Sequence, residues 1–221
     1  MSVKQMLAER KSTRAFLDKQ VDVKLIEDIL DIARQAPSGA NTQPWQVAVV
    51  SGSTKDELTA EIESAFRSGE KAKMDYQYYP LDWQGVYKNR RRACGLQMYS
   101  TLEIGREDKQ RQVDQWAANY RGFDAPVILF FVMDGIMETG SFLDYGMFIQ
   151  SVMLAAQEMG LATCPQAALA EYPSIVKKKL GYADDTILLA GMALGYEDKD
   201  AVINSYRTPR EEVTVFTRFY E

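Results

Sequence analysis

The sequence predicts an α/β or α+β fold built around a central sheet of four or five strands. Short apolar runs rich in β-branched residues alternate with longer segments whose apolar residues recur every three or four positions. The chain has 221 residues, 46% of them hydrophobic and 26% charged, so it can bury a sizeable core. Because no repeat or low-complexity linker divides the chain, we expect one domain spanning residues 1–221.

The first half of the chain alternates helical and strand patterns. Residues 3–9 predict a short helix that stops at a basic turn. Asp22 is a suitable N-cap for a helix that runs to about residue 35, with apolar residues on one face, and the Pro37-Ser38-Gly39 sequence prevents its continuation. Residues 45–50 are short, β-branched and bounded by turn residues, which predicts a buried strand. Ser53 can cap the next helix, which extends to about residue 66.

The second half begins with an excursion from this core. Residues 67–123 contain an irregular aromatic stretch and two helical patterns, at about 87–102 and 107–119, and we expect a helical cap there. Residues 127–133 and 186–194 predict two further strands, and a short strand is expected at 163–165. A long apolar helix spans about 142–159 and ends at Gly160, a natural C′ residue. The alternation of Val213, Val215 and Phe219 could add a strand to a sheet edge.

The composition narrows the chemistry. Histidine is absent, which excludes imidazole bases, Ser-His-Asp and Cys-His arrangements and histidine-bearing zinc sites, so no metal site is predicted. Two cysteines, Cys94 and Cys164, do not suggest a disulfide framework, and a reducing cytoplasm is the default location. No apolar run is long enough to span a membrane. The net charge of −5 argues against nucleic acid as a partner, although the arginine clusters would be the place to look for one.

Four segments carry residues suited to binding a ligand. Arg10-Lys11-Ser12-Thr13-Arg14 offers cations and hydroxyls to a phosphate, and residues 204–210 add two more arginines. The loop from Pro37 to Trp45 presents polar side chains, including Ser38, Asn41 and Gln43, to a planar ligand with ring carbonyls. Residues 163–168 can leave backbone N–H groups free to face a ligand. Each segment taken alone also fits an ordinary surface turn or capped loop.

Together, these segments resemble the nitroreductase family in order and content, from Glu9 to about Val213. Arg10-Lys11-Ser12-Thr13-Arg14-Ala15-Phe16 matches the family's flavin-phosphate motif, and Ala36-Pro37-Ser38-Gly39-Ala40-Asn41-Thr42-Gln43-Pro44-Trp45 matches its most recognisable loop. The helix into Gly160-Leu161 and then Pro165-Gln166-Ala167 matches the segment along the flavin ring, while Gly195-Tyr196 and Arg207-Thr208-Pro209 match the closing arm. The resemblance implies an α+β fold, with helices around a mostly antiparallel sheet, in an intertwined homodimer.

The resemblance also implies a cofactor and its binding residues. The cofactor is FMN, with NADH or NADPH as co-substrate, and its phosphate would be held by Arg10, Ser12 and Arg207, assisted by Lys11 and Arg14. The second subunit would contribute Pro37, Ser38, Gly39, Asn41 and Gln43, and the ring would lie along Pro165, Gln166, Ala167 and Ala168. Some relatives carry Glu-Gly at positions 167 and 168 and a lysine at the position of Ser205, so contacts there could differ in this chain.

The expected reaction is ping-pong hydride transfer through flavin N5, from NAD(P)H to a nitroaromatic or quinone, with no catalytic side chain. Alternatives on the same scaffold are a reductive dehalogenase, a flavin or enone reductase, or a non-catalytic flavin carrier. The cap would serve the small-molecule acceptor: its aromatic residues could stack on a planar ring and its arginines could attract an anionic one, the candidates being Tyr76, Tyr78, Tyr79, Trp83, Tyr87, Arg90, Arg91 and Arg92. Of these, we expect Tyr79, Trp83, Tyr87 and Arg91 to bind the substrate. The alternative is that these aromatics are cap core and the arginines a solvated helix face.

Overall fold

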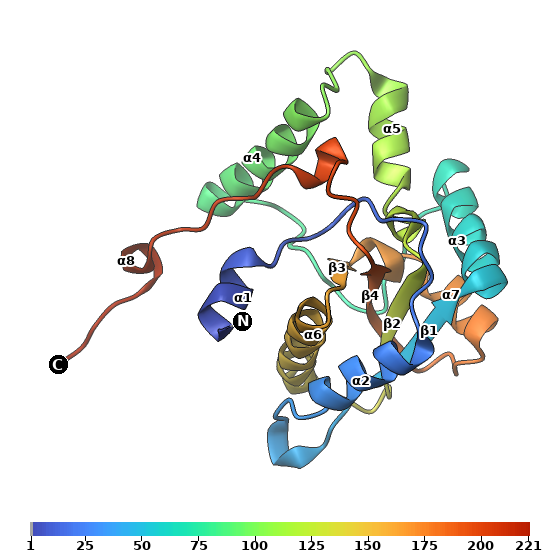
Figure 1. The fold of residues 1–221 in the computed structure, drawn as a ribbon, viewed down its shortest axis with the longest axis vertical. Helices are drawn as coiled ribbons and strands as arrows, with labels where there is room; N and C mark the ends of the chain where they lie inside the picture. Colours follow the sequence, from blue (N-terminus) through green and yellow to red (C-terminus); the bar gives the residue numbers. More distant parts are fainter. Residues whose placement is uncertain (1) are drawn as a thin grey trace.

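The computed structural model describes residues 2–221 and places a four-stranded sheet between two layers of helices (Figure 1). The strands are β1 (Gln46–Ser51), β2 (Val127–Met133), β3 (Ala162–Gln166) and β4 (Ile187–Gly195). Their order in the sheet is β1-β2-β4-β3, and every neighbouring pair is antiparallel. The predicted α+β class, with helices around an antiparallel sheet, is therefore confirmed.

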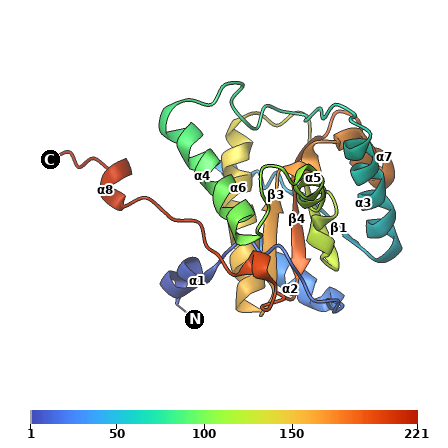
Figure 2. The same ribbon diagram turned by 90° about the horizontal axis from the view of Figure 1, so that it is seen from above.

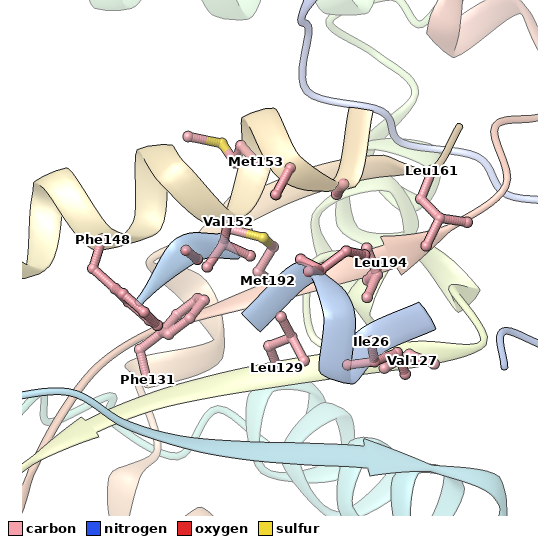
Figure 3. Packing of buried hydrophobic residues seen from close by; sticks show 14 of the residues in the cluster. Ile26, Val127, Leu129, Phe131, Phe148, Val152, Met153, Leu161, Met192 and Leu194 are labelled. Atoms are coloured by element: carbon pink, nitrogen blue, oxygen red, sulfur yellow. The ribbon is translucent and has the colours of Figure 1, made fainter. Parts of the chain in front are cut away.

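Strand β2, one of the two interior strands of the sheet, is apolar throughout because both of its faces are covered. Alternate residues, beginning with Val127 and Leu129, face α2 (Val23–Ala33) and α6 (Gly140–Glu158). Figure 3 shows this side of the core, where Phe148 and Val152 of α6 approach Phe131 and Met192 of the sheet. The intervening β2 residues face α3 (Gly52–Arg67) and α7 (Pro173–Leu180) on the opposite side (Figure 2).

Most predicted elements occur where the sequence placed them. Helix α1 spans Val3–Glu9, α4 spans Gly85–Thr101 and α5 spans Lys109–Ala117. The side chain of Asp22 accepts a hydrogen bond from the N–H of Lys24, so this residue caps α2 as expected. Short 3₁₀ turns complete the chain, at Gly39–Asn41 (η1), Gly122–Asp124 (η2), Ala168–Ala170 (η3) and Val202–Asn204 (η4).

Three details of the sequence prediction were wrong or incomplete. Helix α3 begins at Gly52, so its N-cap is Ser51 and not Ser53. Helix α7 (Pro173–Leu180) was not predicted; Pro173 is its first residue, and Gly181, with a φ of 76° that glycine adopts readily, caps its C-terminal end. The tail forms a single helical turn, α8 (Val213–Phe216), instead of an edge strand, and Figures 1 and 2 show it extending away from the sheet.

The cap and both ends of the chain leave apolar surface uncovered. Helix α4 contains no buried residue, and Tyr87 and Leu96 on it are largely exposed. In the tail, Phe216, Phe219 and Tyr220 are at least 70% exposed, which is unusual for large apolar side chains gathered in one segment. Among residues 2–221, no helix is long and apolar enough to cross a lipid bilayer.

Candidate functional site

A cavity of about 510 Å³ lies between α1, α6 and the segment that follows η4. Five arginine or lysine residues from the N-terminal motif and the tail line it, together with two hydroxyl side chains and a phenol, and no carboxylate lines it among the described residues. Its lining includes Arg10, Lys11, Ser12, Arg14, Tyr206, Arg207, Thr208 and Arg210. This concentration of donors without an opposing anion fits a phosphate group.

Arg10 lies beside two other positive charges of this cluster. Burial, and then the like charges of Arg210 and Arg207, lower the pKa of its guanidinium. The backbone carbonyl of Arg10 also accepts a hydrogen bond of 2.5 Å from Nη2 of Arg207. The N-terminal motif and the C-terminal arginine thus face the same cavity, and bringing these positive charges together destabilises the site until an anion neutralises them.

The N-terminal motif is held in place by the sheet and by Asn204. Ser12 forms an isolated parallel bridge with Thr163, and the N–H of Thr13 donates to the carbonyl of Thr163 at 3.0 Å. Asn204 is buried; its Oδ1 accepts from the N–H of Arg14 at 2.8 Å, and its Nδ2 donates to the carbonyl of Ala15 at 2.9 Å. Sequence reasoning did not identify Asn204 as a functional residue. Its partners Arg14 and Ala15 lie about 190 positions away, and the residues around Asn204 in the sequence do not distinguish it from an ordinary turn asparagine.

Lys11 contributes less charge to the cavity than the sequence suggested. Its ammonium forms an ion pair with Glu197 at 2.6 Å and donates to the carbonyl of Asn204 at 2.6 Å. The side chain of Lys11 is therefore engaged by the protein itself.

The polar loop before β1 is tightly constrained. Ala40, Asn41 and Gln43 all have φ between 48° and 58°, a region that costs non-glycine residues energy. Several contacts hold this conformation, including a bond of 2.9 Å from the N–H of Gln43 to Ser38 Oγ. The N–H of Gly39 donates to Oδ1 of Asp144 at 3.1 Å.

Asp144 belongs to α6 and is only 8% exposed, so it supports the loop from inside the protein. This loop lines neither the arginine cavity nor the apolar cavity described next. Its residues absent from both linings are Pro37, Ser38, Gly39, Asn41 and Gln43.

A second cavity, of about 740 Å³, lies beside the end of β3. Pro165, Gln166 and Ala167 form one wall; Tyr76 and Tyr78 of the cap, Phe142 of α6 and parts of β4 line the remainder. No charged side chain lines it among the described residues, so it suits a planar, mostly apolar group. Ala168 lies in η3, directly after this wall, and does not line the cavity.

The side chain of Gln166 does not reach into the site freely. Its Nε2 donates to the carbonyl of Asn119 at 2.8 Å, while its Oε1 is buried without a hydrogen-bond partner in residues 2–221. Nε2 is therefore engaged by the protein, whereas Oε1 and the backbone of this residue remain able to contact a ring in the cavity.

The two cavities follow one another along a single face of α6. Gly146 and Ile149 line the apolar cavity, and Gln150 lines the arginine cavity. Because residues three and four apart lie on the same side of a helix, one elongated ligand could contact both cavities.

The predicted acceptor residues gather outside the apolar cavity. The rings of Tyr79 and Trp83 are 5.5 Å apart, and the guanidinium of Arg91 lies 5.3 Å from the centre of the Trp83 ring. Tyr87 is 64% exposed on α4. Within one chain Tyr79, Trp83 and Arg91 form an outer aromatic and cationic cluster, with Tyr87 exposed on α4. Of the cap aromatics named from the sequence, only Tyr76 and Tyr78 line the apolar cavity.

A sheet flanked by helices, with a cationic cavity continuing into an apolar one, defines a protein that binds a ligand with an anionic end and a planar end. Residues 7–196 match the Nitroreductase family. A 4-nitrobenzoate reductase from Pseudomonas putida is 38% identical over 214 residues, which cover 97% of this chain and 93% of the relative. The chain therefore belongs to the nitroreductase family.

Two solved structures share the fold along their whole length. One is the FMN- and NADPH-dependent nitroreductase NfnB from Sphigopyxis sp. strain HMH, 38% identical, with a TM-score of 0.96 and full coverage of both chains. The other is the FMN-dependent nitroreductase NfnB from Mycobacterium smegmatis in complex with NADPH, 32% identical, with a TM-score of 0.93 and coverage of 99% of this chain and 97% of that one.

Proposed function

We propose that this protein is an FMN-dependent oxidoreductase that uses NADPH or NADH to reduce nitroaromatic compounds or quinones. The observation that carries the proposal is the succession of an arginine-lined cavity and a charge-free cavity along one face of α6. FMN has the matching shape, with a dianionic phosphate at one end and a flat ring system at the other. The activities and cofactors named for the two NfnB proteins and the nitrobenzoate reductase agree with this proposal.

The arginine cavity would hold the FMN phosphate. Arg10, Ser12, Arg14 and Arg207 supply charged and hydroxyl donors, and Lys11 would assist through its backbone N–H, since Glu197 and Asn204 engage its ammonium. Pro165, Gln166, Ala167 and Ala168 would lie along the ring through backbone groups, so alanine at positions 167 and 168 is compatible with that role. When bound, FMN would supply the two-electron transfer between nicotinamide and acceptor.

We propose that the active form is a homodimer. The loop with Pro37, Ser38, Gly39, Asn41 and Gln43 lines neither cavity of its own chain, and it would reach the flavin of a second copy. The uncovered apolar residues of α4 and the extended tail support this arrangement, because a partner subunit would remove them from water.

We propose that residues 67–123 form a cap on the acceptor side of a single domain. The charge-free walls of the inner cavity would exclude water from a planar acceptor, while the outer cluster of Tyr79, Trp83 and Arg91, together with Tyr87, would meet it at the entrance. We also propose a cytoplasmic location, supported by two free thiols, Cys94 and Cys164.

An absorbance spectrum of the purified protein, followed by anaerobic addition of NADPH and then NADH, tests the proposal. We expect a flavin band that bleaches on addition and recovers with nitrobenzene or a quinone. A band that neither nucleotide bleaches would instead indicate a flavin carrier. Protein that is colourless and does not take up added FMN would contradict the proposal.

A further inference from the structure

A buried ion pair connects the cap to the core at a place that the proposed binding residues do not occupy. Lys177 of α7 is 4% exposed, and its ammonium lies 2.9 Å from both carboxylate oxygens of Asp75 in the cap. It also donates to the carbonyl of Asp184 at 3.1 Å. Oδ2 of Asp75 accepts a further hydrogen bond, from the N–H of Leu188 in β4, at 2.9 Å.

Each charge in this pair is compensated by several contacts. A lysine is rarely buried unless it is paired, because removing an ammonium from water is costly. The arrangement also joins three separate parts of the chain: the cap, α7 and the first residues of β4. An ion pair buried in this way restricts where the backbone at Asp75 can lie.

Neighbouring contacts extend this attachment along the cap. The N–H of Lys73 donates to the carbonyl of Glu171 at 2.9 Å, and the hydroxyl of Tyr76 donates to the carbonyl of Leu189 at 2.7 Å. Burial, and then the neighbouring Tyr78 and Tyr79, raise the pKa of Tyr76, so its hydroxyl remains a donor across the ordinary pH range. Beyond this point the cap becomes exposed, and α4 has no buried residue.

The attached segment forms one wall of the apolar cavity. The ring of Tyr76 lies 4.8 Å from that of Phe142 and 6.1 Å from that of Tyr78, and all three residues line the cavity. Asp75 precedes Tyr76 directly and does not line the cavity itself.

We propose that Asp75, held by Lys177, is a positioning residue that sets the aromatic wall of Tyr76 and Tyr78 against the planar molecule bound in the apolar cavity. This inference rests on the proposed function, because it takes the cavity to hold the flavin ring along Pro165–Ala167 and the acceptor between that ring and the cap residues Tyr76 and Tyr78. Asp75 lines neither the arginine cavity nor the apolar one, so we expect it to act on the site through the next residue, Tyr76.

The test compares Asp75→Asn with a matched control, Glu57→Gln. Glu57 lies on α3 and forms an ion pair with Lys179, which is on α7 like Lys177. Unlike the Asp75–Lys177 pair, this pair is exposed to solvent. For Asp75→Asn we expect the KM for nitrobenzene to rise about tenfold, with a smaller change in kcat and FMN affinity within about twofold of the wild type. For Glu57→Gln we expect all three quantities to match the wild type.

An unchanged KM in Asp75→Asn overturns the positioning role. A parallel loss of FMN affinity also overturns it, because that result would indicate general loss of structure. A wild-type protein that binds no FMN or reduces no acceptor contradicts the proposed function instead, so the two failures are distinguishable. If Asp75→Asn does not fold, Lys177→Met is measured in its place, with the same expected rise in KM and the same overturning result.

A double-mutant cycle with Tyr76→Phe provides a second readout. Removing the hydroxyl breaks the bond to Leu189 and should raise KM in the wild-type background. Because both residues act on one wall, we expect most of that effect to disappear in the Asp75→Asn background. Effects on KM that simply multiply would show that the two residues act independently, and would overturn the proposal.

Discussion

Replacing Arg10 with methionine should separate phosphate binding from protein stability. Methionine keeps an unbranched apolar stem beside Met153, which Nη1 of Arg10 contacts at 4.0 Å. It also leaves intact the backbone carbonyl of Arg10, to which Arg207 donates. The substitution therefore removes one positive charge from the cavity with little other change.

The two expected effects have different signs. A hydrogen bond to a charged group contributes about 1.5–3 kcal/mol, so FMN affinity should fall about 10- to 150-fold. The apoprotein should be as stable as the wild type or more stable, because burial and the charges of Arg210 and Arg207 disfavour the Arg10 cation, as its lowered pKa indicates. The affinity loss should shrink as ionic strength rises.

Equilibrium titration of apoprotein with FMN measures the affinity, and thermal unfolding of the same apoprotein measures stability. Arg34→Met is the control, since Arg34 forms an exposed contact with Asp31 on α2 and should leave FMN affinity unchanged. Unchanged FMN affinity in Arg10→Met would refute the assignment of the phosphate site. A large loss of apoprotein stability would refute the view that these cations repel one another in the absence of an anion.

Three other perturbations have definite expected outcomes. Burial raises the pKa of Cys164 to about 11, whereas Cys94 is exposed. A thiol reagent near neutral pH should therefore label Cys94 quickly and Cys164 only when the protein unfolds. Rapid labelling of two thiols in the native protein would contradict this prediction. Burial raises the pKa of Glu171 above its ordinary value of 4.5, which outweighs the hydrogen bond from Tyr120. The stability that Glu171 contributes is thus present below that ordinary value and is lost as pH rises through the folded-state pKa. The melting temperature of Glu171→Gln relative to that of the wild type should therefore increase from about pH 4 to about pH 7.5. A difference in melting temperature that stays constant over this range would contradict the prediction. Asp144→Ala should weaken FMN retention by releasing the loop at Gly39, whereas the 4.7 Å stacking of Trp45 on Phe148 should keep the protein folded; full FMN affinity measured by titration would exclude a role for this loop in binding.

The lengths and types of most elements follow from local sequence. Strand β2 was predicted at its observed bounds because a run of seven apolar residues, rich in β-branched and aromatic side chains and short for a helix, favours a strand buried on both faces. Helix α7 was missed because it has only eight residues and three consecutive lysines obscure its apolar face. The tail was misassigned because alternation of Val213 and Val215 predicts a strand only where a sheet edge is available, and this segment extends away from the sheet.

The candidate site was predicted in part, and for a clear physical reason. Arginines, hydroxyls and a proline- and glycine-bounded loop have a chemistry that can be recognised without coordinates, so both segments could be proposed as ligand-binding from the sequence. The engagement of Lys11 by Glu197, the support of Gly39 by Asp144 and the attachment of the cap through Asp75 and Lys177 join residues about 100 or more positions apart.

By itself, then, the sequence determined which groups this protein can offer to a ligand, because residue type and local spacing fix charge, hydrogen-bonding capacity and helix or strand preference. Only the tertiary structure decided which of those groups face a common cavity and which are engaged by the protein itself. Each such contact depends on long-range packing. The arginine cavity and the apolar cavity adjoin because α6 passes both, and Tyr76 lines the apolar cavity because the ion pair between Asp75 and Lys177, which are 102 positions apart in sequence, fixes the neighbouring backbone.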